Sequence, residues 1–337
     1  MKYYAGLDVS LKETFLSIVN ETGQVVKEGF ALSDLESLST FLKESGFKYE
    51  KAGIESGQLS ISLCKGLSKK GFPMVCVDAR HMAAVLKAQA INKNDRNDGR
   101  GIAQMMRVGL YKEVQIKSDR SCEEKIILGS RRQLVKNRQQ LMLTIRGLLK
   151  IYGIKIGTQS QFSIKVRGAI EDLSQDVILS MEGLLKALEA IDVSLQDITK
   201  KLIEIGKKDE DCLLLMTVPG VGTITAMTYK GVLDDPKRFE NSETVGAYLG
   251  LTPRQYSSGE TNRHGSISKM GPKECRNLLY ESAFVFLTRS NTSSKLKKWG
   301  LKLVKKKGMK KAVVAVARKL SVIMHRMLIE RKEFCHK

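Results

Sequence analysis

The chain has 337 residues, of which 42% are hydrophobic, and its formal net charge is +21 at pH 7. This length allows about two domains, and the excess of positive charge favours a polyanionic partner such as nucleic acid. Its six cysteines are scattered without a CxxC pair, which argues against a zinc site and against a disulfide framework. No apolar segment reaches membrane-spanning length and the N-terminus does not resemble a signal peptide, so we expect a cytoplasmic, nucleoid-associated protein without a membrane partner.

Residues 1–118 alternate short apolar runs with segments of helical spacing. Three early strands followed by alternating helices and strands are typical of an α/β sheet with mixed strand directions. We expect strands at residues 3–9, 14–20, 24–31, 51–54 and 73–77, and helices at residues 35–46 and 59–71.

Four acids accompany these predicted elements. Asp8 closes the first strand, Glu55 follows the fourth strand, and Asp95 and Asp98 lie three residues apart, so they share one face of a helix that begins there. Carboxylate oxygens suit Mg²⁺ (or Mn²⁺), which prefers a few carboxylates together with water and phosphate oxygens. Each acid alone is most often a solvated surface group, but the set predicts a metal site that acts on nucleic-acid phosphates.

Residues 119–210 show heptad spacing. Leu128, Val135, Met142 and Leu149 repeat every seven residues, and apolar residues between positions 177 and 205 alternate steps of four and three. This pattern predicts a helical, coiled-coil linker. An antiparallel hairpin within the chain, a dimer of two chains and the core of a plain helical bundle all fit it.

Residues 211–290 form a third predicted unit, which is mostly α-helical. An apolar helix runs into a turn with Gly220 and Gly222, and a second helix follows. In a helix-hairpin-helix element of this kind, the glycine turn lets backbone amides approach a DNA phosphate. The alternative is a tight turn between helices that binds nothing.

A polar segment between residues 250 and 271 is the second candidate site. It places Ser257 and Ser258 beside the cations Arg254, Arg263 and Lys269. Glycines in the same segment permit close approach of a phosphate, and we expect a polar loop. A serine needs activation to act as a nucleophile, so the residues alone leave two roles open, a nucleophilic serine and a clamp for phosphate.

Residues 291–337 are expected to form a basic helical tail. From residue 295 onwards it contains 15 Lys and Arg residues against two acids. Lys305, Lys306 and Lys307 are its densest run, for which we expect contacts with a nucleic-acid backbone. A basic amphipathic helix can also lie on a membrane surface, but this stretch lacks the aromatic-rich apolar face of such helices.

The motifs GLDVS at residues 6–10, GIESG at 53–57 and KNDRNDGRGIAQM at 93–105 resemble those of the DEDD-type, bridge-RNA-guided insertion-sequence recombinases, the IS110 group, which is related to Piv-like DNA invertases. VPGVGTITA at 218–226 and the segment from 239 to 279 resemble the C-terminal transposase domain of that group. The third motif of the group often reads Lys-Thr-Asp-Arg-x-Asp. Asn94 replaces the threonine here, and both acids are retained.

The resemblance implies a RuvC-like (RNase H-type) N-terminal domain in which Asp8, Glu55, Asp95 and Asp98 bind Mg²⁺. It also implies a C-terminal serine that attacks the DNA backbone and becomes covalently linked to it. Ser258 is the expected nucleophile and Ser257 the near alternative. The implied partners are DNA, a structured guide RNA, and further copies of the chain in dimers and a tetrameric synaptic complex.

The function expected from all these features is a DNA transposase/recombinase that cleaves and rejoins strands. Two other functions fit the residues. A metal-dependent resolvase of the Holliday-junction type would use the same acids with water as the nucleophile. A non-enzymatic nucleic-acid-binding protein would use only the positive charge. The sequence does not indicate whether insertion, excision or inversion is the main activity.

Overall fold

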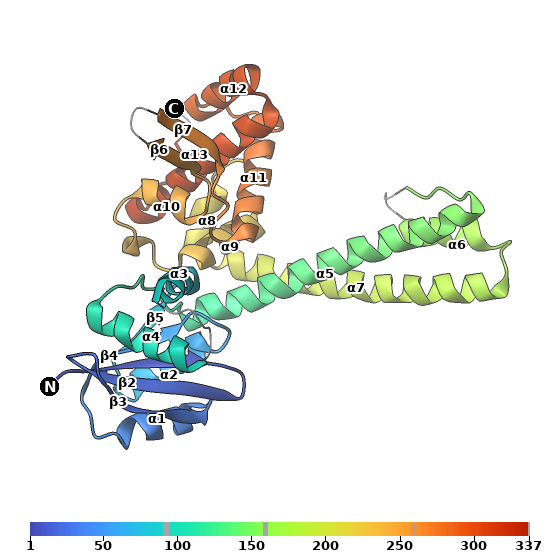
Figure 1. Ribbon diagram of the computed structural model, residues 1–337. Helices are drawn as coiled ribbons and strands as arrows, with labels where there is room; N and C mark the ends of the chain where they lie inside the picture. Colours follow the sequence, from blue (N-terminus) through green and yellow to red (C-terminus); the bar gives the residue numbers. More distant parts are fainter. Residues whose placement is uncertain (90–94, 158–160, 259–260, 336–337) are drawn as a thin grey trace. The chain divides into compact units, whose positions relative to one another are not determined.

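The computed structural model describes residues 1–89, 95–157, 161–258 and 261–335, so Lys93 and Asn94 of the third acidic motif lie outside the described residues. The chain forms two compact units, Met1–Lys117 and Ser118–Lys337. Figure 1 labels the helices and strands of both.

The first unit is a five-stranded mixed sheet in the order β3-β2-β1-β4-β5. β1 and β3 pair antiparallel with β2, whereas β4 runs parallel to β1 and β5 parallel to β4. This is the RNase H-type arrangement that the resemblance implied. The elements are β1 Tyr3–Val9, β2 Glu13–Asn20, β3 Val25–Leu32, α1 Leu35–Lys43, β4 Tyr49–Glu55, α2 Ser60–Lys69, β5 Met74–Val77, α3 Ala79–Gln89 and α4 Asp95–Val108.

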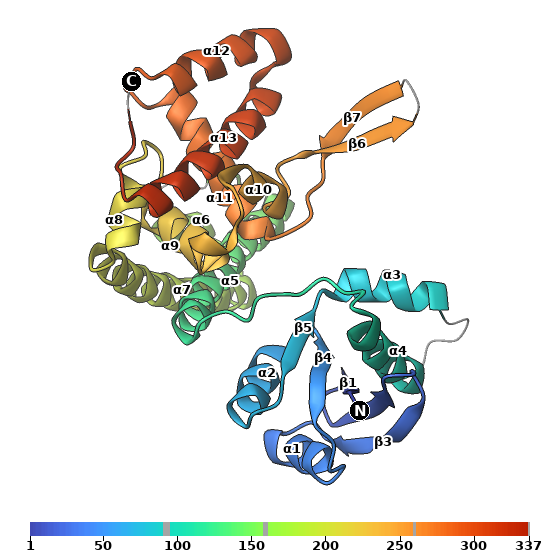
Figure 2. The same ribbon diagram turned by 90° about the vertical axis from the view of Figure 1, so that its left-hand side faces the viewer.

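Side-chain alternation along β1 and β4 decides which helices cover each face of the sheet. Leu7 and Ile54 are fully buried in a core shared with α1 and α2. Because successive residues of a strand point to opposite faces, Gly6 and Gly53 belong to the other face. That face is covered by α4, and Figure 2 shows α1 and α2 on one side of the sheet and α4 on the other.

Helix α4 packs very closely on the sheet because glycines line the contact. A Cβ atom built on Gly6 would lie 2.2 Å from the carbonyl oxygen of Gly99 and 2.4 Å from the backbone nitrogen of Ala103. A Cβ on Gly53 would lie 2.8 Å from the side chain of Met106, and one on Gly99 would lie 2.6 Å from the Phe15 ring. The helix therefore crosses β2, β1 and β4 at a depth that only glycine allows at these positions.

The second unit begins with two long antiparallel helices, α5 Asp119–Leu149 and α7 Gln175–Lys207. They pack along each other within one chain, as Figure 1 shows, which corresponds to the hairpin alternative from the sequence. Between them lie a 3₁₀ turn, Lys150–Tyr152, and the short helix α6 Phe162–Ile170, which shares a small core with both long helices.

A helical body completes this unit around a large buried core. Helix α13 runs through it, and a break at Gly308, where φ is +80°, separates α13 from the lysine-rich α12. Its elements are α8 Glu210–Met216, α9 Thr223–Leu233, the 3₁₀ turn Pro236–Arg238, α10 Ser242–Tyr248, β6 Pro253–Ser258, β7 Thr261–Ile267, α11 Lys273–Thr288, α12 Lys295–Lys307 and α13 Met309–Glu330.

Asp209 ties the long helices to this body. Its side chain is 4% exposed, pairs with Lys230 of α9 and Arg120 of α5, and accepts a hydrogen bond of 2.9 Å from the Cys212 N–H at the start of α8. Burial alone would raise the pKa of Asp209, but the hydrogen bonds from Lys230 and Cys212 outweigh it, so the pKa of this carboxyl is lowered. The ionised form thus joins three helices.

The prediction of a polar loop at residues 250–271 is wrong. β6 and β7 form an antiparallel hairpin there, with Tyr256 paired to Arg263 and Ser258 to Thr261. The error arose because glycine and serine were read as loop formers, whereas the Tyr and Thr residues among them favour an extended strand when paired with a second strand. Within the described residues, none of the helices is long and apolar enough to span a membrane.

Replacing Gly6 by alanine should destabilise the first unit by about 3 kcal/mol, because the new methyl group meets the backbone of α4 rather than a movable side chain. Chemical unfolding of the full chain, followed by circular dichroism, measures the change. Gly129→Ala in α5 is the matched control, since open space surrounds that position. Equal stability of the Gly6→Ala variant and the wild type would contradict the close packing described here.

Candidate functional site

The carboxylates of Asp8 and Glu55 lie at the ends of two neighbouring parallel strands. Leu7 of β1 pairs with Ile54 of β4, so each acid directly follows a paired residue. Both sequences read Gly-x-acid, Gly6-Leu-Asp8 and Gly53-Ile-Glu55. Residues two apart share a face of a strand, so both acids belong to the face that α4 covers.

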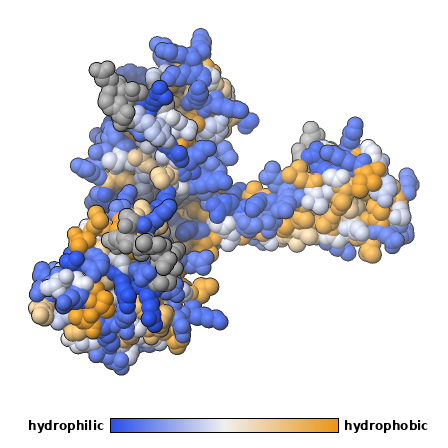
Figure 3. Space-filling model, viewed as in Figure 1, coloured by the Kyte–Doolittle hydropathy of each residue, from blue (hydrophilic) through white to orange (hydrophobic). Residues whose placement is uncertain are grey.

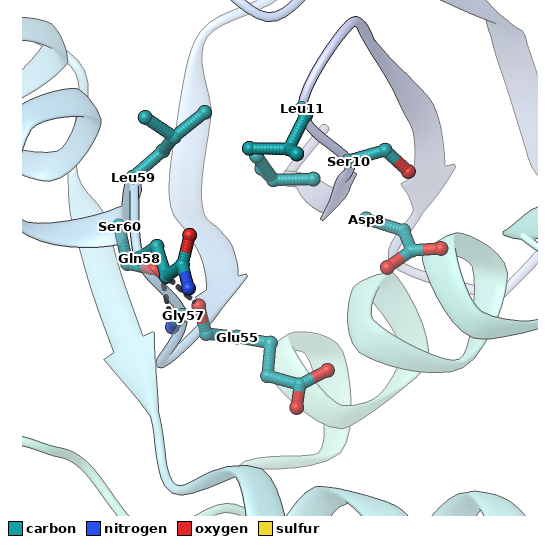
Figure 4. A pocket seen from close by; sticks show the side chains of 9 residues that line it. Asp8, Ser10, Leu11, Glu55, Gly57, Gln58, Leu59 and Ser60 are labelled. Carbon is teal, nitrogen blue, oxygen red and sulfur yellow. Dashed lines mark hydrogen bonds between the residues drawn. The ribbon is translucent and has the colours of Figure 1, made fainter. Parts of the chain in front are cut away.

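A pocket of 290 Å³ opens at these strand ends and is lined by both acids. Figure 4 shows the two carboxylates extending in the same general direction from adjacent strands. The other lining residues are Val9, Ser10, Leu11, Gly57, Gln58, Leu59 and Ser60. Oxygen donors from two neighbouring strands at one open pocket are a suitable start for a Mg²⁺ site.

The turn that follows Glu55 is held by a buried serine. The Ser60 hydroxyl, in a residue only 2% exposed, donates to the carbonyl oxygen of Glu55 and accepts a hydrogen bond of 2.6 Å from the Gly57 N–H. The dashed lines in Figure 4 mark these contacts. Ser60 thereby fixes the backbone from which the Glu55 carboxylate extends. Sequence reasoning missed this residue, although a serine five positions after a strand-end acid was a usable signal.

Asp95 and Asp98 form the first turn of α4. Asp95 is exposed and Asp98 half-buried, and Asp98 immediately precedes Gly99, which packs on Phe15. Phe15 is the cross-strand partner of Asp8, so the start of α4 lies over the strand pair that carries Asp8. Acids in a first turn are also favoured by the helix dipole, a role that requires no metal.

Arg100 anchors this end of α4 to the edge of the sheet. Its guanidinium donates two hydrogen bonds, of 2.8 and 2.6 Å, to the carboxylate of Glu28 on β3. The hydrogen bond from Arg100 lowers the pKa of Glu28 below its usual value. This bidentate pair lies two residues after Asp98 and five after Asp95 and so limits how far they can move.

The four acids are not gathered into a finished metal centre. Within residues 1–89 and 95–157 and the other described segments, no three His, Cys, Asp or Glu side chains come close enough to hold one metal ion. The donor set nevertheless fits Mg²⁺, because it consists of carboxylates alone, two of which line an open pocket at the end of the sheet.

The serine segment is mounted on the helical body by close backbone contacts. A Cβ on Gly250 would lie 2.1 Å from the Met270 carbonyl oxygen, and one on Gly271 would lie 2.1 Å from the Tyr248 carbonyl oxygen. Buried Arg276 of α11 donates a hydrogen bond of 2.9 Å to the Leu249 carbonyl. From this base the hairpin extends away from the helices of its own unit, as Figure 2 shows.

Of the residues expected to act here, Ser258 ends β6, and its side chain lies outside what the structure describes. The side chains of Arg254, Arg263 and Lys269 are exposed. Tyr256 is also 61% exposed and was not among the expected site residues. An exposed aromatic residue flanked by arginines was the signal that sequence reasoning overlooked.

The two glycines of the expected helix-hairpin-helix turn differ in their surroundings. The turn does join two helices, α8 and α9. A Cβ on Gly220, where φ is +87°, would lie 2.6 Å from the Ser282 carbonyl of α11, so this glycine is needed for packing within the protein. Gly222 is exposed and faces open space. Contact of this turn with a phosphate backbone therefore remains a prediction. Exposed Gly222 is better suited to such a contact than Gly220.

The lysine-rich helix α12 ends in a run of exposed cations. Lys305, Lys306 and Lys307 are exposed, and among the described residues none of them forms an ion pair with an acid. Figure 3 shows hydrophilic residues over this helix and exposed apolar residues along the α5–α7 pair. Unpaired cations on one exposed helix suit a phosphate backbone.

Comparisons with known proteins match both the N-terminal and the C-terminal part of the chain to transposases. Residues 5–154 match the family model of IS110-type DEDD transposases, and residues 212–298 match that of the transposase IS116/IS110/IS902 family. The transposase for insertion sequence element IS1111A of Coxiella burnetii is 27% identical over 98% of this chain and 90% of its own length. The pilin gene-inverting protein of Moraxella lacunata is 30% identical over 36% of this chain and 38% of its own length.

Among solved structures, T. thermophilus RuvC in complex with a Holliday junction substrate aligns with 34% of this chain and 100% of its own, at 13% identity and a TM-score of 0.27.

An RNase H-type sheet with strand-end acids, joined to a helical transposase unit, defines a DNA transposase or recombinase. The chain belongs to the IS110/IS116 family of transposases.

Replacing Ser60 by alanine should weaken Mn²⁺ binding by about tenfold, because the turn that carries Glu55 loses its hydroxyl bridge. Isothermal titration of the full chain with Mn²⁺ measures this. Ser39→Ala is the control, since Ser39 is equally buried and bonds the Glu36 carbonyl in α1, away from the pocket. Equal Mn²⁺ affinities of the two variants would show that Ser60 does not position Glu55.

Proposed function

We propose that this chain is a DNA recombinase that cleaves and rejoins strands by combining a carboxylate-bound Mg²⁺ with a serine nucleophile. The observation that carries the metal half is the repeated Gly-x-acid sequence on adjacent parallel strands, with Asp8 and Glu55 both lining one pocket at the ends of these strands. Family membership supports the serine half and the functional class.

Asp8, Glu55, Asp95 and Asp98 are the residues that would hold Mg²⁺ or Mn²⁺. When bound, such an ion polarises a phosphate and helps to stabilise the charge of attacking and leaving oxygens. The fold would bring the four carboxylates toward one another, because two are carried by strands and two by a helix whose position the glycine contacts set. Because like charges oppose that approach, a cation is needed to bring them together.

Ser258 would act on the DNA backbone. Its oxygen forms a bond to phosphorus, the bond from phosphorus to the strand oxygen breaks, and the serine proton passes to the leaving oxygen. A strand hydroxyl then attacks the serine phosphodiester, which seals the new strand and restores the serine. Each step exchanges one P–O bond for another, so strand exchange needs no ATP.

The exposed cations would bind the substrate. Arg254 and Arg263 lie on the two strands of the hairpin, Lys269 lies just beyond the end of β7, and the lysines of α12 add a second basic surface. Contacts with phosphates give affinity with a strong salt dependence and little sequence information. We therefore propose that base pairing with a structured guide RNA selects the DNA sequence. We further propose that dimers join in a tetrameric complex during exchange.

Replacing Ser258 by alanine should abolish the covalent protein–DNA adduct and lower strand exchange on the order of 10⁴-fold or more, because the nucleophile is lost. The full chain is incubated with Mg²⁺, DNA of the element's ends and RNA transcribed from its flank. A denaturing gel with and without protease then reveals the adduct. Ser257→Ala is the matched control and should retain it.

Asp8→Asn should abolish both adduct and exchange in the same assay. Cleavage by Ser258→Ala that is unchanged, leaves no protease-sensitive adduct and is lost on Asp8→Asn would show a resolvase that uses water. If wild type and Asp8→Asn alike process no DNA yet bind it equally, the protein is a nucleic-acid-binding protein without this activity.

A further inference from the structure

The β6–β7 hairpin carries an exposed aromatic ring between two cations. Tyr256 is 61% exposed, and its partner on β7 is Arg263, which is exposed as well. Arg254 precedes the tyrosine by two positions, so it shares a face of β6 with it. Neither β6 nor β7 contains an acidic residue, and among the described residues no acid forms an ion pair with either arginine.

A glycine on the second strand lies beside the ring. A Cβ on Gly265 would lie 3.6 Å from Cε2 of Tyr256 and 3.8 Å from Cβ of Arg254. The tyrosine thus lies beside a position without a side chain, an arrangement in which an aromatic ring covers a cross-strand glycine. One side of the ring is supported by the hairpin, and the rest faces solvent.

The hairpin base keeps this ring in a defined place. The Ser268 N–H donates to the Thr252 carbonyl at 2.8 Å, and the Lys269 N–H donates to the Gly250 carbonyl at 3.1 Å. Together with the Gly250 and Gly271 contacts, these bonds fix the start of β6 and the end of β7 on the helical body. A side chain on a fixed ribbon loses little conformational entropy when it binds.

We propose that Tyr256 stacks on an unpaired base of the DNA strand beside the reacting phosphate, while Arg254 and Arg263 bind the flanking phosphates. This inference rests on the proposed function in one respect, the role of Ser258. Position 258 follows Tyr256 by two residues, about 7 Å along the strand. The base on the tyrosine therefore belongs to a nucleotide next to the phosphate that reaches the serine.

An unpaired base is the partner that this chemistry favours. Both faces of a base inside a duplex are covered by its neighbours, so an aromatic ring can stack only on a base that is single-stranded or flipped out. Stacking accepts any base, and arginines beside the ring add contacts with the backbone and cation–π attraction. Tyr256 is then a residue that positions the strand, without a role in proton transfer.

The test uses the full chain and oligonucleotides of the element's end that contain one 2-aminopurine at successive positions, as single strands and as duplexes, in EDTA. Tyr256→Ala should weaken single-strand binding by about 5- to 100-fold and abolish the fluorescence change on binding. Tyr256→Phe should bind within about twofold of the wild type, because the ring is retained. Tyr152→Ala is the control, since Tyr152 is 51% exposed in the same unit but far along the chain from the hairpin.

Three results would overturn the inference. Tyr256→Leu binding as tightly as wild type would show that an apolar side chain suffices without stacking. Equal losses for duplex and single strand would show that the hairpin reads a duplex groove. A 2-aminopurine response far from the nucleotide that becomes linked to protein would show that Tyr256 binds elsewhere. Because binding is measured without cleavage, the two proposals can fail separately. If the wild type forms no adduct while the Ser258→Ala protein binds the strand normally, the proposed role of Ser258 is refuted and the stacking of Tyr256 is not.

Discussion

The contact between α4 and the glycines of β1 and β4 is the constraint on which the N-terminal site depends. A Cβ on Gly6 would lie 2.2 Å from a backbone oxygen of the helix, so α4 can occupy its place only above glycine. Two residues further on, the same strands carry Asp8 and Glu55, while the helix begins with Asp95 and Asp98. The packing of α4 on these glycines thus sets the backbone positions that carry all four carboxylates. It also explains why each acid on a strand is preceded by glycine in the same register.

Much of this fold could be predicted from the sequence because its signals are local. Apolar alternation indicated the strands, and the heptads at residues 177–205 indicated a long helix, but periodicity alone could not tell a partner helix in the same chain from one in another. The hairpin at 253–267 was missed because its strands are polar on both faces, so neither shows the alternation that marks a half-buried strand. Gly220 shows the converse: the turn was predicted, whereas its packing against α11 depends on residues sixty positions away.

The functional residues of the candidate site were predictable from the sequence, but the residues that position them were not. Motif and charge indicated the acids, the serine pair and the arginines. Ser60, which bridges the turn after Glu55, and Tyr256, which lies beside Gly265, were overlooked because their sequence signals do not show which backbone groups or residues they contact. Each functional group is therefore positioned by a residue without chemistry of its own. Glycines under α4 position the helix acids, a buried serine hydroxyl positions the glutamate, and two glycines at its base position the hairpin.

In the proposed site, the strand acids and the helix acids bind one metal ion together. A double-mutant cycle of Mn²⁺ affinity with Asp8→Asn, Asp98→Asn and the combined variant tests this shared binding. If the acids share an ion, each single variant loses most of the binding energy, and the double variant loses far less than the sum of the two. Additive losses, or an Asp98→Asn protein that binds Mn²⁺ like the wild type, would contradict the claim and assign the helix acids to the dipole of α4 instead.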